Sequence, residues 1–519
     1  MKMEITCTLI SVSCVFSVLF FLASKILYSV WLKPKCLEKC LRAQGLNGNP
    51  YRLLVGDMKD LGKLHNEALS KPINFSDDIL SRVSPFLVEI IKKYGNNSFF
   101  WLGPTPSVLI LDPETVKEIF INYNRFLKRP GNAVTDLLQK GLISYEGEEW
   151  EKHRRIINPA FYKEKLKHMV PAFHLSVKEM LGEWEAIVSH EGKGELDVWP
   201  HLQRLTSDAL SRTAFGSSYE EGRKIFELQR EQVEHLMTLS RSFFLPIFRF
   251  LPTKRNRRMK YIAKEVSHSI KEIIENRLKA IKEGEANSKH DLLGLLLESN
   301  QKEIQMHGHR KFGITTKEVI EDCKLFYVAG QETTSVLLVW TLVLLARHQE
   351  WQSRAREEVL EKFGKNQPDF EGLNHLQIVT MILNETLRLY PPIIFLDRTI
   401  QEDTKIGSLS LPSGTLVTIP IILLHYDTKI WGGDAKDFKP ERFAEGVSNA
   451  TKGQSVFLPF GGGPRMCIGQ NFTMVEAKLA LTMILQNFSF ELSTSYSHAP
   501  HTVFTLVPQH GAHLILRKL

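Results

Sequence analysis

The most continuous apolar stretch of the chain lies near its amino terminus. From Ile5 to Ser24, twenty residues follow one another without a charge, and Leu, Val, Phe and Ile are frequent among them. A helix of this length rises about 30 Å, which matches the hydrocarbon core of a bilayer. Lys25 interrupts the run, but apolar residues continue to Leu32. We therefore expect a membrane anchor over residues 1–32, followed by a basic hinge containing Gly and Pro over residues 33–50.

A cleaved signal peptide is the alternative interpretation of this stretch. Its apolar region would run for about 7–15 residues and would end at a small-residue cleavage site. The observed run is longer, and basic residues follow it at Lys33, Lys35, Lys39 and Arg42. Basic residues prefer the cytoplasmic side of a membrane span. The pattern therefore favours an uncleaved, single-pass anchor that leaves the rest of the chain in the cytosol.

From residue 51 to residue 519, no linker or low-complexity segment divides the chain. Two short apolar runs, 99–102 and 108–111, are separated by Gly and Pro and predict a small β-sheet. Apolar positions recur at the helical period in residues 116–123, 150–158, 219–239 and 258–283. We expect one folded domain over residues 51–519, mainly α with a small β-sheet region.

Residues 243–252 form a short apolar and aromatic segment between two predicted helices. A basic cluster follows immediately, at Lys254, Arg255, Arg257, Arg258 and Lys260. A loop that combines aromatic and basic side chains can settle among anionic lipid headgroups. A buried loop beside a solvated run of charges fits the same pattern. Membrane insertion of this loop therefore stays an open alternative.

A long apolar helix is predicted over residues 315–345, and its first residues have the Thr-x-x-Glu pattern of a capping box. Polar residues interrupt it at 329–334, where Gly330, Glu332 and Thr333 stand in an otherwise apolar run. Such residues weaken a helix locally and tend to mark function. We expect Gly330 to leave room for a ligand and Thr333 to compete for a backbone carbonyl.

Composition and charge narrow the classes of function. The chain has 519 residues, of which 43% are hydrophobic and 24% charged, as is ordinary for a globular enzyme. A formal net charge of +8 at pH 7 favours an anionic partner or membrane surface, and no nucleic-acid partner is expected. Only Cys323 and Cys467 of the six cysteines follow residue 40, which excludes a secreted disulfide scaffold.

Cys467 lies in a glycine-rich turn, Phe460–Gly469, with Arg465 two residues before it. The cysteine has no partner at the spacing of a zinc site, and glycines let the backbone approach a flat group closely. An axial thiolate beneath haem iron fits this arrangement, and a buried inert thiol is the alternative. The turn resembles the cysteine loop of the cytochrome P450 family, Phe-x-x-Gly-x-Arg-x-Cys-x-Gly, at every fixed position.

This resemblance implies a cytochrome P450 fold with haem b (iron protoporphyrin IX) as cofactor and Cys467 as the metal ligand. The cofactor-binding residues that it implies are Trp150, Arg154, Arg398, Phe460, Arg465 and Gly469. The tryptophan N–H and the arginine guanidinium groups would hold the haem carboxylates, because buried carboxylates need partners. A solvated helix face is the alternative for Arg154.

Residues 329–334 resemble the Ala-Gly-x-Asp/Glu-Thr-Thr element of the same family. In that family protons are delivered as the O–O bond of dioxygen breaks. The resemblance therefore implies catalytic roles for Thr333, as the proton donor, and for Glu332, as its connection to solvent through water. Glu385, Arg388 and Arg442 match the Glu-x-x-Arg and Pro-Glu-Arg-Phe elements, which implies a structural network that takes no part in the chemistry.

Residues 157–161, 329–338 and 470–472 resemble one plant group, that of secologanin synthase and the triterpenoid oxidases. The resemblance implies a plant microsomal monooxygenase in the endoplasmic reticulum membrane. Its partners would be O2, a small lipophilic substrate and NADPH–cytochrome P450 reductase. The basic residues between Lys152 and Lys167 are a candidate docking patch for that reductase.

The expected substrate is a triterpenoid, hydroxylated and then taken on to an aldehyde or carboxylic acid where oxidation continues. An iridoid of the loganin type is the second choice. The expected pocket is mostly apolar and is lined by residues 132–143, 326–333, 393–395 and 501–505. Two hypotheses of other classes are a hydroperoxide isomerase of the same fold, which would not need Thr333, and a haem-binding protein without enzymatic activity.

Overall fold

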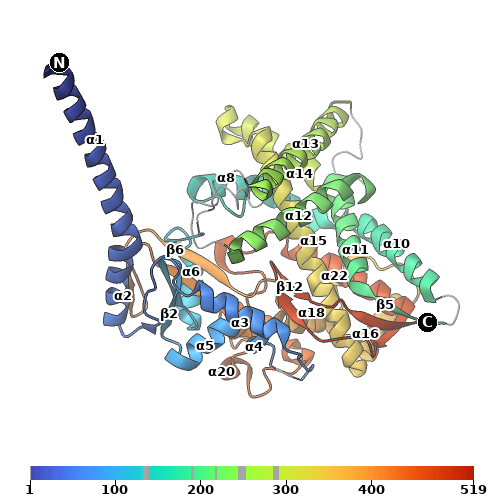
Figure 1. Ribbon diagram of the computed structural model, residues 1–519. Coiled ribbons are helices and arrows are strands. Elements are labelled where there is room, and N and C mark those ends of the chain that lie inside the picture. The colour runs from blue at the N-terminus through green and yellow to red at the C-terminus, as the bar shows by residue number, and fades with distance from the viewer. Residues whose placement is uncertain are drawn as a thin grey trace.

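The computed structural model describes residues 2–76, 78–129, 131, 137, 140–188, 192–216, 219–242, 253–283 and 291–519. A long helix, α1 (Lys2–Leu27), projects from a body built mainly of helices (Figure 1). Helices dominate the described residues, and the strands gather in small sheets. The fold class predicted from the sequence is thereby confirmed.

Helix α1 carries the amino-terminal apolar run. A short π-helical segment (Tyr28–Leu32) joins it to α2 (Lys33–Ala43). The apolar window of this continuous helix is not buried by the rest of the protein, and it is long and apolar enough to cross a membrane. The amino-terminal helix is therefore a candidate membrane span, as the hydrophobic pattern predicted.

The segment expected to act as a hinge, residues 33–50, packs onto the body instead. Leu37 and Leu41 of α2 and Leu46 after it are buried. Residues 47–48 then form β1, which pairs with β2. The Tyr51 hydroxyl donates to the Val30 carbonyl at 2.6 Å and ties the end of the apolar helix to the body. Leucines at helical spacing give this segment an apolar face, so the connection is short and well anchored.

In the described part of the chain, the strands form a six-stranded sheet and three smaller ones. The large sheet has the order β1 (Asn47–Gly48), β2 (Ser98–Leu102), β3 (Thr105–Leu109), β9 (Leu416–Ile419), β6 (Leu396–Ile400) and β4 (Phe126–Leu127). The smaller sheets are β10 (Phe488–Leu492), β13 (His513–Lys518) and β5 (Lys193–Asp197); β11 (Pro500–Thr502) and β12 (Leu506–Pro508); and β7 (Thr404–Ile406) and β8 (Leu409–Leu411). Strands β2 and β3 lie on the two predicted apolar runs.

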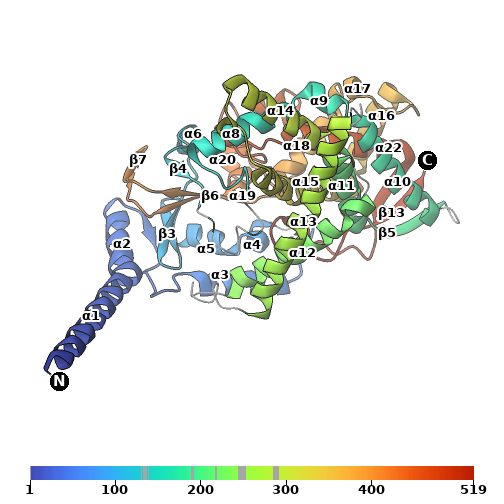
Figure 2. The same cartoon turned by 90° about the horizontal axis from the view of Figure 1, so that it is seen from above.

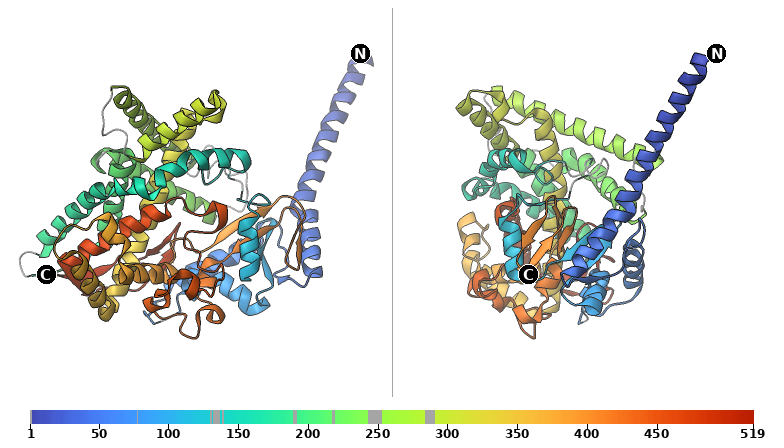
Figure 3. Two further views of the ribbon diagram at one scale, coloured as in Figure 1. Left: turned by 180° about the vertical axis from the view of Figure 1, so that it is seen from behind. Right: turned by 90° about the vertical axis from the view of Figure 1, so that its left-hand side faces the viewer.

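The helices of the body are distributed along the whole chain. They are α3 (Met58–Ser70), α4 (Leu80–Val83), α5 (Pro85–Tyr94), α6 (Pro113–Ile121), α8 (Gly147–Ile157), α9 (Lys163–Lys167), α10 (Val170–Val188), α11 (Val198–Phe215), α12 (Tyr219–Ser242), α13 (Lys254–Glu283), α14 (Leu292–His307), α15 (Thr316–Arg347), α16 (Gln349–Phe363), α17 (Phe370–Asn374), α18 (Gln377–Leu389), α19 (Ile421–His425), α20 (Thr428–Trp431), α21 (Gly446–Ala450) and α22 (Gln470–Asn487). The large sheet and α2 to α6 lie near α1, whereas α10, α16 and α22 lie toward the carboxyl terminus (Figure 2 and Figure 3).

Helix α15 runs through the middle of the helical part (Figure 1). Its start has the predicted capping box: the Thr315 hydroxyl accepts from the Glu318 N–H at 3.3 Å, and the Glu318 carboxylate accepts from the Thr315 N–H at 2.6 Å. Every residue from Thr334 to Ala346 is buried. A helix that is apolar all round is a membrane span or a core element, and burial identifies α15 as the core helix.

Candidate functional site

The cysteine loop leads into α22 and is pinned against α6. The Cys467 N–H donates to the Phe460 carbonyl at 2.9 Å, which closes the loop. A Cβ atom at Gly462 would come within 2.9 Å of the Phe120 ring, and Gly463 has a φ of +64° with the Phe120 carbonyl close by. Both positions need glycine, the first for space and the second for its backbone conformation.

Cys467 is an exposed residue, although protein atoms surround its thiol closely. Burial raises the pKa of this thiol, whereas the Gly469 N–H, the cations of Arg154 and Lys128 and the Gln470 N–H lower it. Donors and cations near a sulfur favour the thiolate, which is the form that binds a metal. The pKa of the thiol is raised overall, and the neighbouring N–H groups and cations offset part of the effect of burial by stabilising the thiolate.

Three cations converge near this loop: Lys128, Arg398 and Arg465. Burial, with contributions from Arg398 and Arg465, lowers the pKa of Lys128 to about 7. Burial and Arg465 also lower the pKa of the Arg398 guanidinium. The Glu146 carboxylate acts in the opposite direction and raises the pKa of all three cations. The Asp397 carboxylate also raises the pKa of Arg398, but two carboxylates do not fully balance three partly buried cations, so the cluster suits a ligand that brings further carboxylates.

Arg465 joins the cysteine loop to the segment before α8. Its guanidinium forms an ion pair with Glu146, donates to the Tyr145 carbonyl at 2.8 Å and lies over the Trp150 ring, 4.4 Å from its centroid. The Arg465 Nε is buried and has no hydrogen-bond partner in the described part of the chain. A buried guanidinium N–H without an acceptor is a donor available to a bound carboxylate.

Trp150 and Arg154 lie one turn apart on α8. Trp150 is buried beneath the Arg465 guanidinium. Arg154 donates at 3.0 Å to the carbonyl of Met466, the residue directly before Cys467. Arg154 therefore supports the backbone of the loop and also stabilises a negative charge on the Cys467 sulfur. The exposed residue Cys467, the cluster of cations and the Arg465 Nε–H, which is unpaired among the described residues, all belong to this region, and together they fit haem.

The polar patch on α15 departs from the regular helix pattern. The Thr333 hydroxyl donates to the Ala329 carbonyl at 2.7 Å, within its own helix. A Cβ atom at Gly330 would come within 3.1 Å of the Leu210 side chain on α11. The expectation that Gly330 leaves room for a ligand is therefore wrong. This glycine allows the close packing of α11 on α15.

The Glu332 carboxylate accepts a hydrogen bond from the Thr505 hydroxyl at 2.5 Å. Thr505 is fully buried and lies on the turn between β11 and β12. Burial raises the pKa of Glu332, while the Thr505 hydrogen bond and the Arg230 cation lower it. The direct partner of this carboxylate is thus a buried hydroxyl, whereas the sequence predicted a connection to solvent.

Glu385 and Arg388 on α18 form a buried network with Arg442, which lies in the 3₁₀ turn Pro440–Phe443. Arg388 donates to both carboxylate oxygens of Glu385, each at 2.7 Å, and both side chains are fully buried. Arg442 Nε lies 3.5 Å from the same carboxylate, and the Lys439 N–H donates to it at 2.9 Å. The Arg388 guanidinium also donates to the backbone carbonyls of His425 and Ala435. The network predicted from the sequence is present.

An apolar cluster lies beside the polar patch of α15. Val328 from α15 packs with Val233 and Leu236 from α12, Met259 from α13, and the partly buried Leu137 and Phe504. Segments 326–333 and 501–505, which were expected to line the pocket, therefore share one apolar cluster. Of the other expected lining, Ile394 is buried, and residues 132–136 and 138–139 lie outside the described residues. The segment 243–252, the candidate membrane loop, also lies outside the described residues.

The sequence did not predict the roles that Lys128 and Thr505 have in this site. Lys128 follows β4, the strand that pairs with β6, and β6 carries Arg398. In the sequence, the signal for Lys128 is only a basic residue at the end of a short strand. Its proximity to Arg398 results from the strand pairing, which joins distant segments. Thr505 was expected to line the pocket, and its contact with Glu332 spans 173 positions of sequence.

The basic patch expected to receive a reductase is partly neutralised. Arg155 pairs with Glu303 at 3.1 Å, and Lys167 pairs with Glu371 at 3.2 Å. The Lys152 ammonium lies 3.7 Å from the Glu318 carboxylate. Ion pairs on the surface reduce the field that a basic patch presents to an acidic partner. The patch therefore carries less free positive charge than its sequence suggested.

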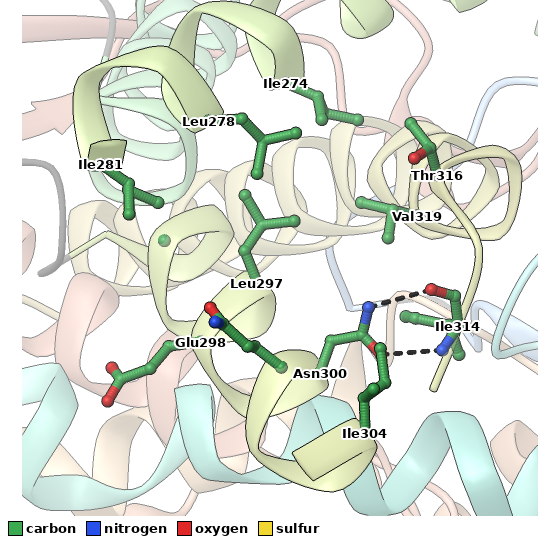
Figure 4. A pocket seen from close by; sticks show the side chains of 12 residues that line it. Ile274, Leu278, Ile281, Leu297, Glu298, Asn300, Ile304, Ile314, Thr316 and Val319 are labelled. Atoms are coloured by element: carbon green, nitrogen blue, oxygen red, sulfur yellow. Dashed lines mark hydrogen bonds between the residues drawn. The ribbon is translucent and has the colours of Figure 1, made fainter. Parts of the chain in front are cut away.

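A cavity of about 420 Å³ lies apart from these residues (Figure 4). It is lined by α13, α14 and the first turn of α15, and half of its twelve lining residues are Ile or Leu, with the polar Glu298, Asn300, Gln301 and Thr316 among the others. Asn300 is held in place by two hydrogen bonds with the backbone of Ile314. Neither Cys467 nor Thr333 lines this cavity, so it is separate from the candidate site.

Comparisons with known proteins agree with this geometry. The family model described as Cytochrome P450 matches residues 81–514. The chain is 59% identical over 517 residues to Cytochrome P450 CYP72A219 of Panax ginseng, covering 100% of both chains. It is 55% identical over 497 residues to Cytochrome P450 72A397 of Kalopanax septemlobus, covering 96% of this chain and 95% of the relative. It is 51% identical over 508 residues to Secologanin synthase 2 of Catharanthus roseus, covering 97% of this chain and 96% of the relative.

Proposed function

The chain belongs to the cytochrome P450 family of haem b monooxygenases, and on that premise we propose that it oxidises a triterpenoid at a C–H bond. The product would be an alcohol, carried on to an aldehyde or carboxylic acid where oxidation continues. The apolar cluster of Val328, Phe504 and their neighbours beside the α15 patch supports a large lipophilic substrate with few polar handles.

We assign the cofactor-holding roles to residues on both sides of the cysteine loop. Cys467 would hold the iron as a thiolate, stabilised by the N–H groups of Gly469 and Gln470. Lys128, Arg398 and Arg465 would bind the two haem carboxylates, which would remove the repulsion among these cations. Haem supplies the activation of dioxygen, and the protein supplies its binding, orientation and protons.

The proton-handling residues lie on α15. Thr333 would hold a proton at its hydroxyl, where a change of hydrogen-bond partner from the Ala329 carbonyl makes it available. Glu332 would replace that proton, because burial raises the pKa of its carboxyl and so favours the protonated form. The apolar neighbours would exclude bulk water, which limits the loss of protons and electrons to side reactions.

The electron donor would be NADPH–cytochrome P450 reductase, since the family requires a redox partner. We place the protein in the endoplasmic reticulum membrane, with α1 as a single span and the catalytic domain in the cytosol. The apolar helix and the basic residues after it support this placement.

Microsomes containing this chain and the reductase, supplied with NADPH and a panel of triterpenoids and iridoids, test the substrate class. Mass spectrometry should detect an NADPH-dependent product 16 Da heavier than one triterpenoid, the mass of one oxygen atom. Cys467→Ala microsomes are the matched control and should give none. Turnover of iridoids alone would overturn the triterpenoid assignment.

An iridoid is the second candidate substrate because one relative at 51% identity is a secologanin synthase. The same panel separates the two classes. Product formation without NADPH would instead indicate a rearrangement such as hydroperoxide isomerisation.

A further inference from the structure

The turn between β11 and β12 is fixed to α15 at two points. The Trp340 indole N–H donates to the Leu506 carbonyl at 2.7 Å. One residue earlier, the Thr505 hydroxyl donates to the Glu332 carboxylate at 2.5 Å. The Leu506 N–H donates to the Pro392 carbonyl at 3.0 Å, which holds the turn from its other side. Thr505 itself is fully buried. The hydrogen bonds hold its turn in place against α15.

We propose that Thr505 is a positioning residue for proton delivery: its hydroxyl holds the Glu332 carboxyl in place in both of its protonation states. This inference rests on the proposed role of Glu332. A hydroxyl has one proton to donate and two lone pairs to accept. It can donate to the carboxylate, as in the structure, and can accept from the carboxylic acid once Glu332 takes up a proton.

The surroundings of Glu332 leave this task to Thr505. The charged group whose field reaches the carboxylate is Arg230 on α12, whose side chain is exposed. Helix α11 presents the apolar Leu210 to the neighbouring Gly330. No guanidinium or ammonium makes a direct hydrogen bond to Glu332 among the described residues, so its local partner is the hydroxyl. A cationic partner would lock the carboxylate, because guanidinium groups only donate.

The same turn also faces the apolar cluster. Phe504, next to Thr505, packs against the apolar cluster that Val328 of α15 forms with side chains of α12 and α13. A substrate that contacts Phe504 would therefore press on the residue that holds Glu332. The hydrogen bonds between α15 and the β11–β12 turn therefore hold Glu332 and the substrate-facing Phe504 in a fixed relation.

Thr505→Val and Thr505→Ser test the proposal in the holoenzyme. Valine keeps the shape and removes the hydroxyl, whereas serine keeps the hydroxyl. We expect Thr505→Val to lower product formed per NADPH several-fold with an unchanged carbon monoxide difference spectrum, and Thr505→Ser to restore it. In the Glu332→Gln background, Thr505→Val should have no further effect on coupling. Wild-type coupling in Thr505→Val, or equal impairment in Thr505→Ser, would overturn the proposal.

A second measurement needs no turnover. Without the Thr505 hydroxyl the buried carboxylate loses its donor, so the pKa of Glu332 rises further and the charged form becomes more costly. The loss in Tm caused by Thr505→Val should therefore grow as pH rises. Thr502→Val is the matched control, since the buried Thr502 hydroxyl has no hydrogen-bond partner in the described part of the chain, and its Tm effect should not depend on pH.

The two measurements separate this inference from the proposed function. A pH-dependent Tm loss with no turnover of any substrate by the wild type would support the contact and refute the assigned reaction. A pH-independent Tm loss in Thr505→Val would overturn the positioning role, whatever the substrate.

Discussion

Two glutamates, both shielded from solvent by the protein, have opposite surroundings. Glu385 on α18 receives two hydrogen bonds from Arg388 at 2.7 Å, one from the Lys439 N–H at 2.9 Å, and the nearby Arg442 cation. Among the residues that the structure describes, Glu332 on α15 receives one hydrogen bond at its carboxylate, from the Thr505 hydroxyl, and burial raises its pKa. The first carboxylate is saturated by donors that cannot accept a proton, and the second is not.

These different surroundings distinguish a glutamate that supports the structure from one that is suited to proton transfer. A carboxylate whose oxygens are tied to guanidinium groups is held in one position, and such a network fixes structure. A buried carboxylate with a hydroxyl partner can gain and lose a proton without losing its contact. Sequence neighbours alone do not make this distinction, because each glutamate precedes a Thr in the chain.

The comparison first requires that the cofactor is bound, and Cys467→Ala removes its proposed iron ligand. We expect the largest effect of all, complete loss of monooxygenase activity. Because thiolate ligation gives the red-shifted Soret band of the reduced carbon monoxide complex, that band should disappear. Difference spectroscopy of microsomes checks this, with immunoblotting to show that the variant is made. A retained red-shifted band would mean that another residue binds the iron.

Arg388→Ala tests the saturated region. The variant leaves the buried Glu385 carboxylate without its two strongest donors, so we expect a loss of about 3–5 kcal/mol in the free energy of unfolding. Most of the protein should then fail to fold with haem, and the yield of the carbon monoxide complex should fall accordingly. Arg356→Ala is a control, since this arginine on α16 donates to backbone carbonyls and a glutamine rather than to a buried acid. Equal losses in both variants would argue against a special role for the Glu385 network.

Thr333→Ala tests the unsaturated region. A positioned proton donor contributes about 10²–10⁴-fold, and because water can replace a hydroxyl we expect a loss near 10²-fold in product formation. NADPH consumption should continue, so the ratio of product to NADPH should drop while the carbon monoxide spectrum stays intact. Thr333→Ser keeps the hydroxyl and should stay close to the wild type. Unchanged coupling in Thr333→Ala would remove Thr333 from the proton path.

A smaller effect should appear in the pH dependence of coupling. The pKa of Glu332 is raised, so the protonated form persists to a higher pH than for an ordinary glutamate, and proton donation is lost as pH rises through that pKa. Wild-type coupling should fall by a few-fold over this range, and Glu332→Gln should show no such step. The stability contribution of a group with a raised pKa is likewise lost with rising pH. The Tm of Glu332→Gln relative to wild type should therefore increase as pH rises.

The features predicted well from the sequence are local ones. The amino-terminal apolar helix, the capping box at Thr315 and the tight turn around Cys467 follow from residues within a few positions of one another. The features that were missed depend on contacts between distant segments. Gly330 packs on Leu210 of another helix, Lys128 meets Arg398 through strand pairing, and Thr505 reaches Glu332 across the fold.

The central claim is that the unsaturated glutamate does the chemistry and the saturated one holds the structure. The most direct test compares Glu332→Gln with Glu385→Gln in one preparation, measuring the reduced carbon monoxide spectrum and the product formed per NADPH. We predict that Glu332→Gln keeps the thiolate-type spectrum and loses coupling, while Glu385→Gln loses the spectrum itself. Full coupling in Glu332→Gln, or an intact spectrum with selective uncoupling in Glu385→Gln, would contradict it.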